Sequence, residues 1–170
     1  MSRSCVVQID DESSAYRSVP QYVDFSRCQK WLKTCFEDHE SCKAVQTLNA
    51  KDPIKLVDTA TRRVVSFAQK GSIEYATLSY VCGPGYSLCV LQGSQGWSRD
   101  EDGRPYHLLP ASMPATLRDA MTVVQKLNMR YLWVDSICIA QDDDKEKQTQ
   151  ISQMFNIYND AAFASCPLMA

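Results

Sequence analysis

Polar side chains that directly follow two apolar segments could form a ligand site. Ser79, Tyr80 and Gly83 follow the segment YATL, and Asp135 and Ser136 follow YLWV. If both segments are strands of an open α/β sheet, their carboxyl ends share the edge at which such sheets bind ligands. The same side chains could instead fix the loops by bonding to backbone amides, and both roles stay open. The candidate ligand-edge residues are Ser79, Tyr80, Gly83, Asp135, Ser136, Cys138, Gln141 and Asp142.

An apolar strand that ends in an acid is also typical of the magnesium-binding strand of phosphate-loop NTPases. That class requires a GxxxxGK[ST] loop on an earlier strand. The glycine-rich segment GPGYSLCVLQG contains no lysine, which excludes this class. The acids Asp142 to Asp144 precede a predicted helix from Lys145, where acids cap the positive helix end. We therefore interpret this run as a helix cap and not as a metal site.

Cys35, His39 and Cys42 have the residue types of a zinc site. On one continuous helix, however, Cys35 and Cys42 lie about 10 Å apart along the axis. Both short side chains could not then reach one zinc ion at about 2.3 Å. Two of the three could still bind an ion with ligands from elsewhere, but the sequence offers no obvious second pair. We therefore favour a packed apolar stripe over a zinc site and expect no metal here.

The eight cysteines of the chain raise the question of a cysteine nucleophile. Cys82 or Cys138 could pair with His107 as a base, but such a pairing is easy to produce by chance in a cysteine-rich chain. The chain has no CxxC motif and no export signal. We therefore expect reduced cysteines, most of which pack as small hydrophobic side chains.

Hydrophobic periodicity and turn residues predict the elements that would position these side chains. Ser112 should cap the central helix, Asn128 should end it, and Pro114 suits its first turn. The helix from Lys145 should direct Ile151, Met154, Phe155 and Tyr158 inward. In chain order we expect an amphipathic helix over 25–46, a β-hairpin over 53–68, a strand over 74–83, an irregular loop over 83–103, a helix over 112–128, a strand over 131–137, a helix over 145–159 and a strand from 161.

The strand–helix–strand–helix–strand order from Glu74 onward favours an open α/β fold with a mostly parallel sheet. The chain has 170 residues, 45% of them hydrophobic, and a net charge of −2. This composition predicts one globular, cytoplasmic domain and gives no reason to expect a nucleic-acid or membrane partner. We expect a flexible tail over 1–22, a helix and hairpin segment over 23–72, and the main domain over 73–170.

Three segments resemble the blocks of the heterokaryon incompatibility (HET) domain of fungi. They are YATLSYVCG at 75–83, LPASMPATLRDAMTVVQKLNMRYLWVDSICIAQDD at 109–143 and QISQMFNIYNDAA at 150–162. KWLKTCFEDHESC at 30–42 is similar to a short segment often found ahead of that domain. The resemblance assigns structural roles to Tyr75, Leu78, Pro110, Asp119, Ala120, Tyr131, Trp133, Met154 and Tyr158.

The resemblance implies a signalling and interaction module in fungal non-self recognition and programmed cell death, with protein partners or self-association. HET domains are regarded as distant relatives of Toll/interleukin receptor (TIR) domains, which implies a TIR-like or flavodoxin-like sheet. Some TIR domains cleave NAD with a glutamate on the helix after the third strand. No cofactor is expected except NAD under this enzyme alternative.

Two departures from the family pattern bear on the enzyme alternative. Cys82 stands where the family usually has an aromatic residue, which removes packing surface beside the proposed site. The chain ends at Ala170, whereas the family domain normally continues, so we expect a C-terminally truncated domain. No residue can be given the role of the TIR glutamate, and we expect an interaction domain and not an enzyme. An inactive remnant is a third alternative.

Overall fold

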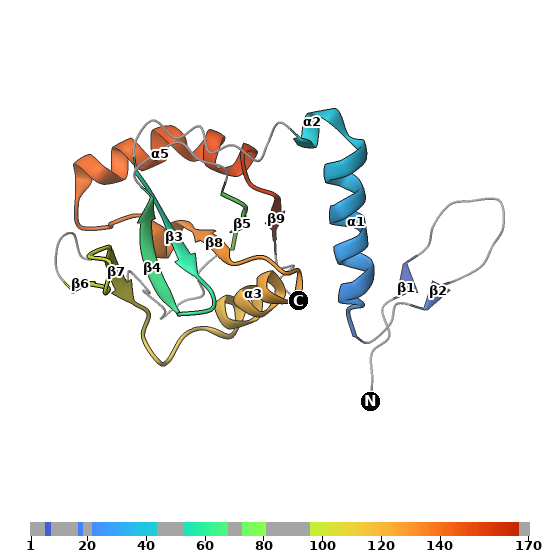
Figure 1. Cartoon of the computed structure of the whole chain (residues 1–170), viewed down its shortest axis with the longest axis horizontal. Helices are drawn as coiled ribbons and strands as arrows, with labels where there is room; N and C mark the ends of the chain where they lie inside the picture. Colours follow the sequence, from blue (N-terminus) through green and yellow to red (C-terminus); the bar gives the residue numbers. More distant parts are fainter. Residues whose placement is uncertain are drawn as a thin grey trace.

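The computed structural model describes residues 6–7, 17–18, 22–43, 53–67, 73–80 and 96–166. Most of the described strands form one open sheet, flanked by helices (Figure 1). No described helix is long and apolar enough to cross a membrane. Within the predicted tail, the short strands β1 (Val6–Val7) and β2 (Arg17–Ser18) pair antiparallel.

The main sheet has seven strands in the order β6-β7-β4-β3-β8-β5-β9 among the described residues. Only β8, β5 and β9 run parallel to one another, and the other four pairings are antiparallel. The prediction of a mostly parallel sheet is therefore wrong, although an α/β fold with an open sheet is confirmed. The strands are β3 (Ile54–Asp58), β4 (Arg63–Phe67), β5 (Tyr75–Leu78), β6 (Trp97–Arg99), β7 (Pro105–Leu108), β8 (Tyr131–Val134) and β9 (Phe163–Ser165).

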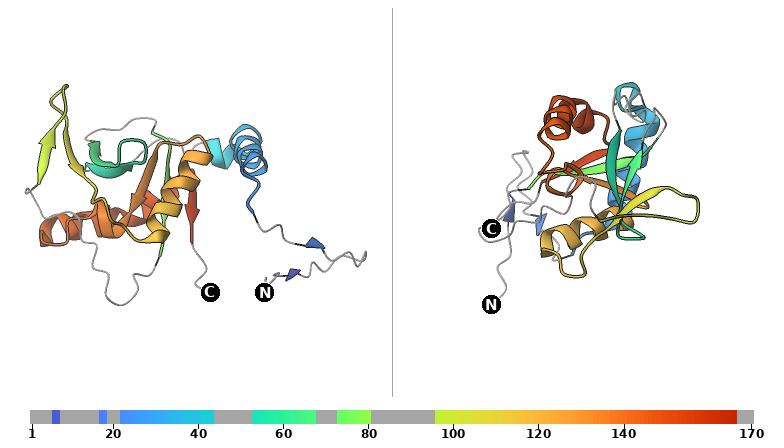
Figure 2. Two further views of the ribbon diagram at one scale, coloured as in Figure 1. Left: turned by 90° about the horizontal axis from the view of Figure 1, so that it is seen from below. Right: turned by 90° about the vertical axis from the view of Figure 1, so that its left-hand side faces the viewer.

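Helices α3 (Ala115–Lys126) and α5 (Asp144–Asn159) cover opposite faces of the sheet (Figures 1 and 2). The core lies between them and is built largely from β3, β5, β8 and the short helix α4 (Asp135–Cys138). Trp133 is fully buried and packs edge-on against Tyr158 of α5, with ring centroids 5.3 Å apart. The fully buried side chains therefore lie where β8 crosses the middle of the sheet.

The predicted hairpin over 53–68 is confirmed as β3 and β4, which pair antiparallel around residues 59–62. The sequence did not indicate its second pairing. β3 also pairs with β8 through Val57↔Leu132 and Asp58↔Tyr131, so the hairpin extends the sheet of the main domain.

The prediction of an irregular loop over 83–103 is wrong at the C-terminal end of that range. β6 and β7 form a hairpin there, joined to β4 through Val64↔His107 and neighbouring pairs. Gly103 adopts φ +75° in the hairpin turn, a conformation that glycine reaches without the strain of a side chain. Gly83 and Cys82 lie outside the described residues.

Most of the prediction for helix α3 is confirmed. Leu117, Met121 and Val124 are buried in a stripe, and Asn128 ends the helix with φ +60°, as expected of a left-handed stop. Ser112 does not cap the helix, because Pro114 occupies the N-cap position and provides no side-chain hydrogen bond. The chain enters this helix through the fixed backbone of proline.

The N-terminal helix differs from its prediction in length and burial. Helix α1 (Phe25–Asp38) ends at His39, and a separate short helix α2 (Glu40–Lys43) follows (Figure 1). No residue of α1 is buried, and Trp31 is 63% exposed. The helix contacts the end of α3 through a hydrogen bond from Gln29 Nε2 to the Lys126 carbonyl at 2.6 Å. It also lines a cleft of about 310 Å³ together with Leu127 and with Phe163 of β9.

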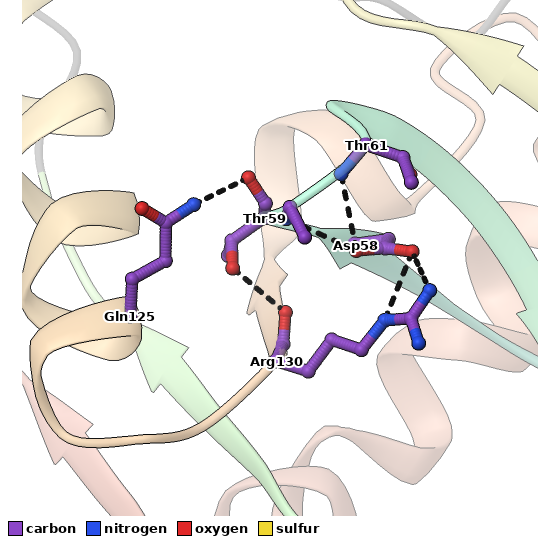
Figure 3. A network of polar contacts seen from close by, with 6 residues as sticks. Asp58, Thr59, Thr61, Gln125 and Arg130 are labelled. Carbon is purple, nitrogen blue, oxygen red and sulfur yellow. Dashed lines mark hydrogen bonds and ion pairs between the residues drawn. The ribbon is translucent and has the colours of Figure 1, made fainter.

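A polar network connects the β3–β4 turn to the loop that enters β8 (Figure 3). Arg130 donates to Asp58 Oδ2 from Nη2 at 2.6 Å and from Nε at 3.1 Å. Thr59 Oγ1 donates to the Arg130 carbonyl at 2.9 Å, and Gln125 Nε2 donates to the Thr59 carbonyl at 2.6 Å. Burial opposes ionisation of Asp58, but hydrogen bonds from Arg130 and Thr61 outweigh it and hold the pKa of Asp58 below its ordinary value.

The residues with predicted structural roles lie in three environments. Tyr75, Leu78, Ala120 and Trp133 are buried, and the Tyr75 hydroxyl donates to the Ile157 carbonyl of α5 at 2.7 Å. Pro110 and Asp119 are exposed, although the Pro110 carbonyl accepts a hydrogen bond from Arg62 Nη2 at 2.9 Å. Tyr131, Met154 and Tyr158 are half-buried against the core.

Candidate functional site

A pocket of about 410 Å³ lies beyond the carboxyl ends of β5 and β8, on the α5 side of the sheet. This volume falls within the range of small-molecule sites. Its lining residues are Tyr80, Asp135, Ser136, Ile139, Gln141, Lys147, Ile151 and Met154.

The parallel pairing of β5 with β8 brings the two halves of the pocket together. Leu78 and Val134 are register partners, so the residues two positions further along each chain meet beyond the sheet. The Tyr80 hydroxyl and Ser136 Oγ lie 3.2 Å apart, within hydrogen-bond distance. The predicted convergence of polar side chains at this edge is therefore observed for Tyr80 and Ser136.

Asp135 begins a single helical turn and does not extend the strand. The strand predicted over 131–137 ends at Val134, and α4 follows directly. This turn directs Ile137 and Cys138 into the core, which leaves Asp135 and Ser136 half-buried at the pocket. Asp135 Oδ1 accepts a hydrogen bond from the Ser136 amide at 2.6 Å, so this carboxylate fixes the turn and also lines the pocket.

Helix α5 forms the facing wall. Asp143 caps it by accepting a hydrogen bond from the Glu146 amide at 2.9 Å, which confirms the predicted capping role of the acid run. Lys147, Ile151 and Met154 recur at helical spacing and line the pocket from one face of the helix.

The inward face of α5 differs from its prediction. Gln150, Gln153 and Ile157 are buried, whereas Ile151 is 44% and Phe155 80% exposed. Gln150 Nε2 donates to the Pro53 carbonyl next to β3 at 2.9 Å, which offsets part of the cost of burying an amide. Met154 and Tyr158 pack against the core as predicted, whereas Ile151 and Phe155 do not.

The pocket contains both charged and neutral polar groups. Asp135 supplies a carboxylate, Lys147 an ammonium group, Gln141 an amide, and Tyr80 and Ser136 two hydroxyls. Such a set can bind a small polar ligand through hydrogen bonds and charge.

Tyr158 and Ser79 lie beside the pocket. Burial raises the pKa of Tyr158, a hydrogen bond with Ser79 opposes that rise, and the nearby Asp135 carboxylate adds to it. The Ser79 amide bonds to the Ser165 carbonyl of β9 at 2.9 Å. Ser79 thus joins the end of β5 to its neighbours and does not line the cavity.

The remaining predicted site residues lie elsewhere. Cys138 is fully buried, and burial raises the pKa of its thiol to about 12, so it is not an accessible nucleophile at neutral pH. Asp142 is exposed and does not line the pocket. Gly83 lies outside the described residues. Lys147 and Ile139 also line the pocket but were not predicted as site residues. For Lys147 the signal was its spacing from Ile151 and Met154, which places all three on one face of a helix.

A model of the family described as heterokaryon incompatibility protein (HET) matches residues 75–169. This match covers more than half of the chain. The chain belongs to the HET family. Its matched part includes β5, β8, α4 and α5, and therefore every element that positions the pocket.

A curated relative carries the same description. Heterokaryon incompatibility protein 6, OR allele, of Neurospora crassa is 31% identical over 93 residues. The match covers 51% of this chain but only 13% of the relative. No solved structure matches the chain.

Proposed function

We propose that this HET chain is a cytoplasmic signalling and interaction module that acts in fungal non-self recognition and programmed cell death. The observation that carries the proposal is the family match over residues 75–169. The relative in Neurospora crassa is named for heterokaryon incompatibility, which supports the general role.

This function requires a binding partner, which is either another protein or a second copy of the chain. Helix α5 supports it, because Phe155 and Ile151 lie one turn apart and are 80% and 44% exposed. Exposed large apolar side chains on one helix face are common in protein-binding surfaces. The net charge of −2 favours neither nucleic acid nor anionic membrane as the partner.

The second candidate function is a TIR-like enzyme that binds and cleaves NAD. It is supported by the position of the pocket outside the carboxyl ends of two parallel strands, where α/β sheets bind nucleotides. Asp135 is the acid at this position, and the neighbouring hydroxyls of Tyr80 and Ser136 could orient a ribose or phosphate group.

The two functions differ in what happens to cellular NAD. Residues 1–170 would be induced in a fungal host while NAD and viability are followed together. Two variants separate the candidate surfaces, namely Asp135→Ala in the pocket and Phe155→Ser on α5. Asp102→Ala is the matched control, because Asp102 is an exposed acid between β6 and β7 and lies outside the pocket.

We expect cell death with NAD unchanged, and we expect Phe155→Ser to restore viability while Asp135→Ala and Asp102→Ala do not. If NAD falls before death and only Asp135→Ala preserves it, the enzyme function replaces the interaction function. Soluble protein that changes neither NAD nor viability would contradict both and indicate an inactive chain.

A further inference from the structure

The bend between α1 and α2 brings three metal-binding side chains together. Cys35, His39 and Cys42 follow one another in a C-x3-H-x2-C pattern. Their ligand atoms, two Sγ atoms and one imidazole nitrogen, all lie within 4.8 Å of one another. This cluster lies outside the pocket and outside the residues matched by the family model.

The cluster exists because α1 does not continue through His39. His39 has extended backbone angles, φ −101° and ψ 111°, and its amide still bonds to the Cys35 carbonyl at 3.2 Å. The Cys42 amide then bonds to the His39 carbonyl at 3.0 Å, which turns α2 back toward α1 (Figure 1). The separation of about 10 Å expected for one continuous helix therefore does not apply, and the geometric objection to a shared metal ion is wrong.

The distance between the two sulfur atoms fits a shared ion better than a disulfide. Cys35 Sγ donates to Cys42 Sγ across 3.2 Å. Two thiolates on one tetrahedral zinc ion lie about 3.8 Å apart, given Zn–S bonds of about 2.3 Å. Bonded sulfur atoms lie about 2.05 Å apart. The observed separation is closer to the zinc geometry and needs a smaller movement to reach it.

Packing does not explain why these polarisable side chains gather here. No residue of α1 is buried, Cys35 and Cys42 are half-buried, and His39 is exposed. Among the described residues, the predicted apolar stripe is at most half-buried, against a cleft that Leu127 and Phe163 also line. The same partial exposure gives an ion a path to all three ligands.

We propose that Cys35, His39 and Cys42 bind one Zn²⁺ ion, which fixes α2 against the end of α1. Two thiolates balance the charge of the ion, and a mixed sulfur and nitrogen ligand set favours zinc over magnesium or calcium. The described residues supply three ligands, so water or another group completes the tetrahedron. A metal ion would supply the fixed geometry that hydrophobic burial does not supply in this part of the chain.

Metal content and cobalt spectroscopy on the complete chain test the proposal. The chain would be purified with a reductant and without chelators, and zinc and free thiols would be counted. We expect about one zinc ion per chain. Co²⁺ in place of zinc should give a thiolate-to-cobalt charge-transfer band and the visible bands of a tetrahedral ion.

Three variants with a matched control locate the ligands. Cys35→Ser, Cys42→Ser and His39→Ala should each weaken zinc binding by at least about tenfold, the smallest effect typical of losing even an outer partner of a metal ligand. Cys28→Ser is the control, because Cys28 is a half-buried cysteine on the same helix and should leave binding unchanged. Circular dichroism checks that each variant keeps its fold.

The wild-type cobalt spectrum does not depend on the folding of any variant. A chain that binds neither metal while its thiols titrate as free would overturn the proposal. A Cys35–Cys42 disulfide that persists under reductant, or a Cys28→Ser variant that loses zinc as fully as Cys42→Ser, would also overturn it.

Discussion

An aspartate lies near each end of β8, and the two carboxylates make different kinds of contact. At the entry to β8, Asp58 is 3% exposed and accepts hydrogen bonds from the Ala60 and Thr61 amides and from Arg130. At the exit, Asp135 is half-buried, bonds to the Ser136 amide, and lines a cavity.

The difference in hydrogen-bond partners distinguishes an acid that stabilises the fold, Asp58, from one that can bind a ligand, Asp135. The Asp58 carboxylate connects two segments about 70 residues apart, and its partners are protein groups. Asp135 is bonded locally and faces a pocket with a lysine and two hydroxyls. An acid near a strand end is thus a functional candidate only where its oxygen atoms are not already satisfied across the fold.

Removal of Asp58 should have the largest effect on stability. Asp58→Ala loses an ion pair in which two Arg130 nitrogens donate to one carboxylate oxygen, and it also loses two turn hydrogen bonds. Arg130 stays solvated because its side chain is 58% exposed. We expect the free energy of unfolding to fall by roughly 2–3 kcal/mol, measured by urea denaturation. Asp102→Ala is the control, because its pair with Arg104 is 3.6 Å long and exposed. A similar loss in both variants would contradict the distinction.

The pH dependence of stability should show the Asp58 carboxylate directly. Its pKa is lowered in the folded protein, so its stabilising effect is complete above the ordinary value of about 3.9. The effect is lost as pH falls through the lower folded pKa. The stability difference between wild type and Asp58→Asn should therefore shrink below about pH 4. A difference that stays constant from pH 7 to pH 3 would show that the charge is not what matters.

Replacement of Asp135 should have the smallest effect on stability. Asp135→Asn keeps an oxygen atom that can accept from the Ser136 amide, so we expect a change within about 0.5 kcal/mol in urea denaturation. A loss as large as that of Asp58→Asn would instead make Asp135 a structural residue and remove the main reason to assign a ligand to this pocket.

Local sequence patterns predicted the individual elements better than their arrangement. The hairpin over 54–67 and the stop at Asn128 follow from turn residues and periodicity. The pairing of Val57 with Leu132 was not predictable in this way, because it joins residues far apart in the sequence. The same holds for the hydrogen bond from Gln150 to the Pro53 carbonyl, which joins residues 97 positions apart.

The pocket was predictable because neighbouring strands determine it. The cysteine and histidine cluster was not, because it depends on the bend between α1 and α2. Tyr80 and Ser136 follow paired strands, so a correct expectation for β5 and β8 was enough to bring them together. No glycine or proline lies near His39 in the sequence to predict the end of the helix there. The cluster of Cys35, His39 and Cys42 was therefore not predicted, because one continuous helix was expected.

The double pairing of β8 also has a consequence for the order of folding. The β3–β4 hairpin needs only local contacts and can form within microseconds. The sheet cannot close until β8 arrives, because β8 is the strand between β3 and β5. Closing these long chain loops costs entropy before the contacts compensate for it. On a ribosome, the β3 edge of the hairpin would therefore stay unpaired until residue 134 has emerged, whereas its β4 edge can pair earlier with β7.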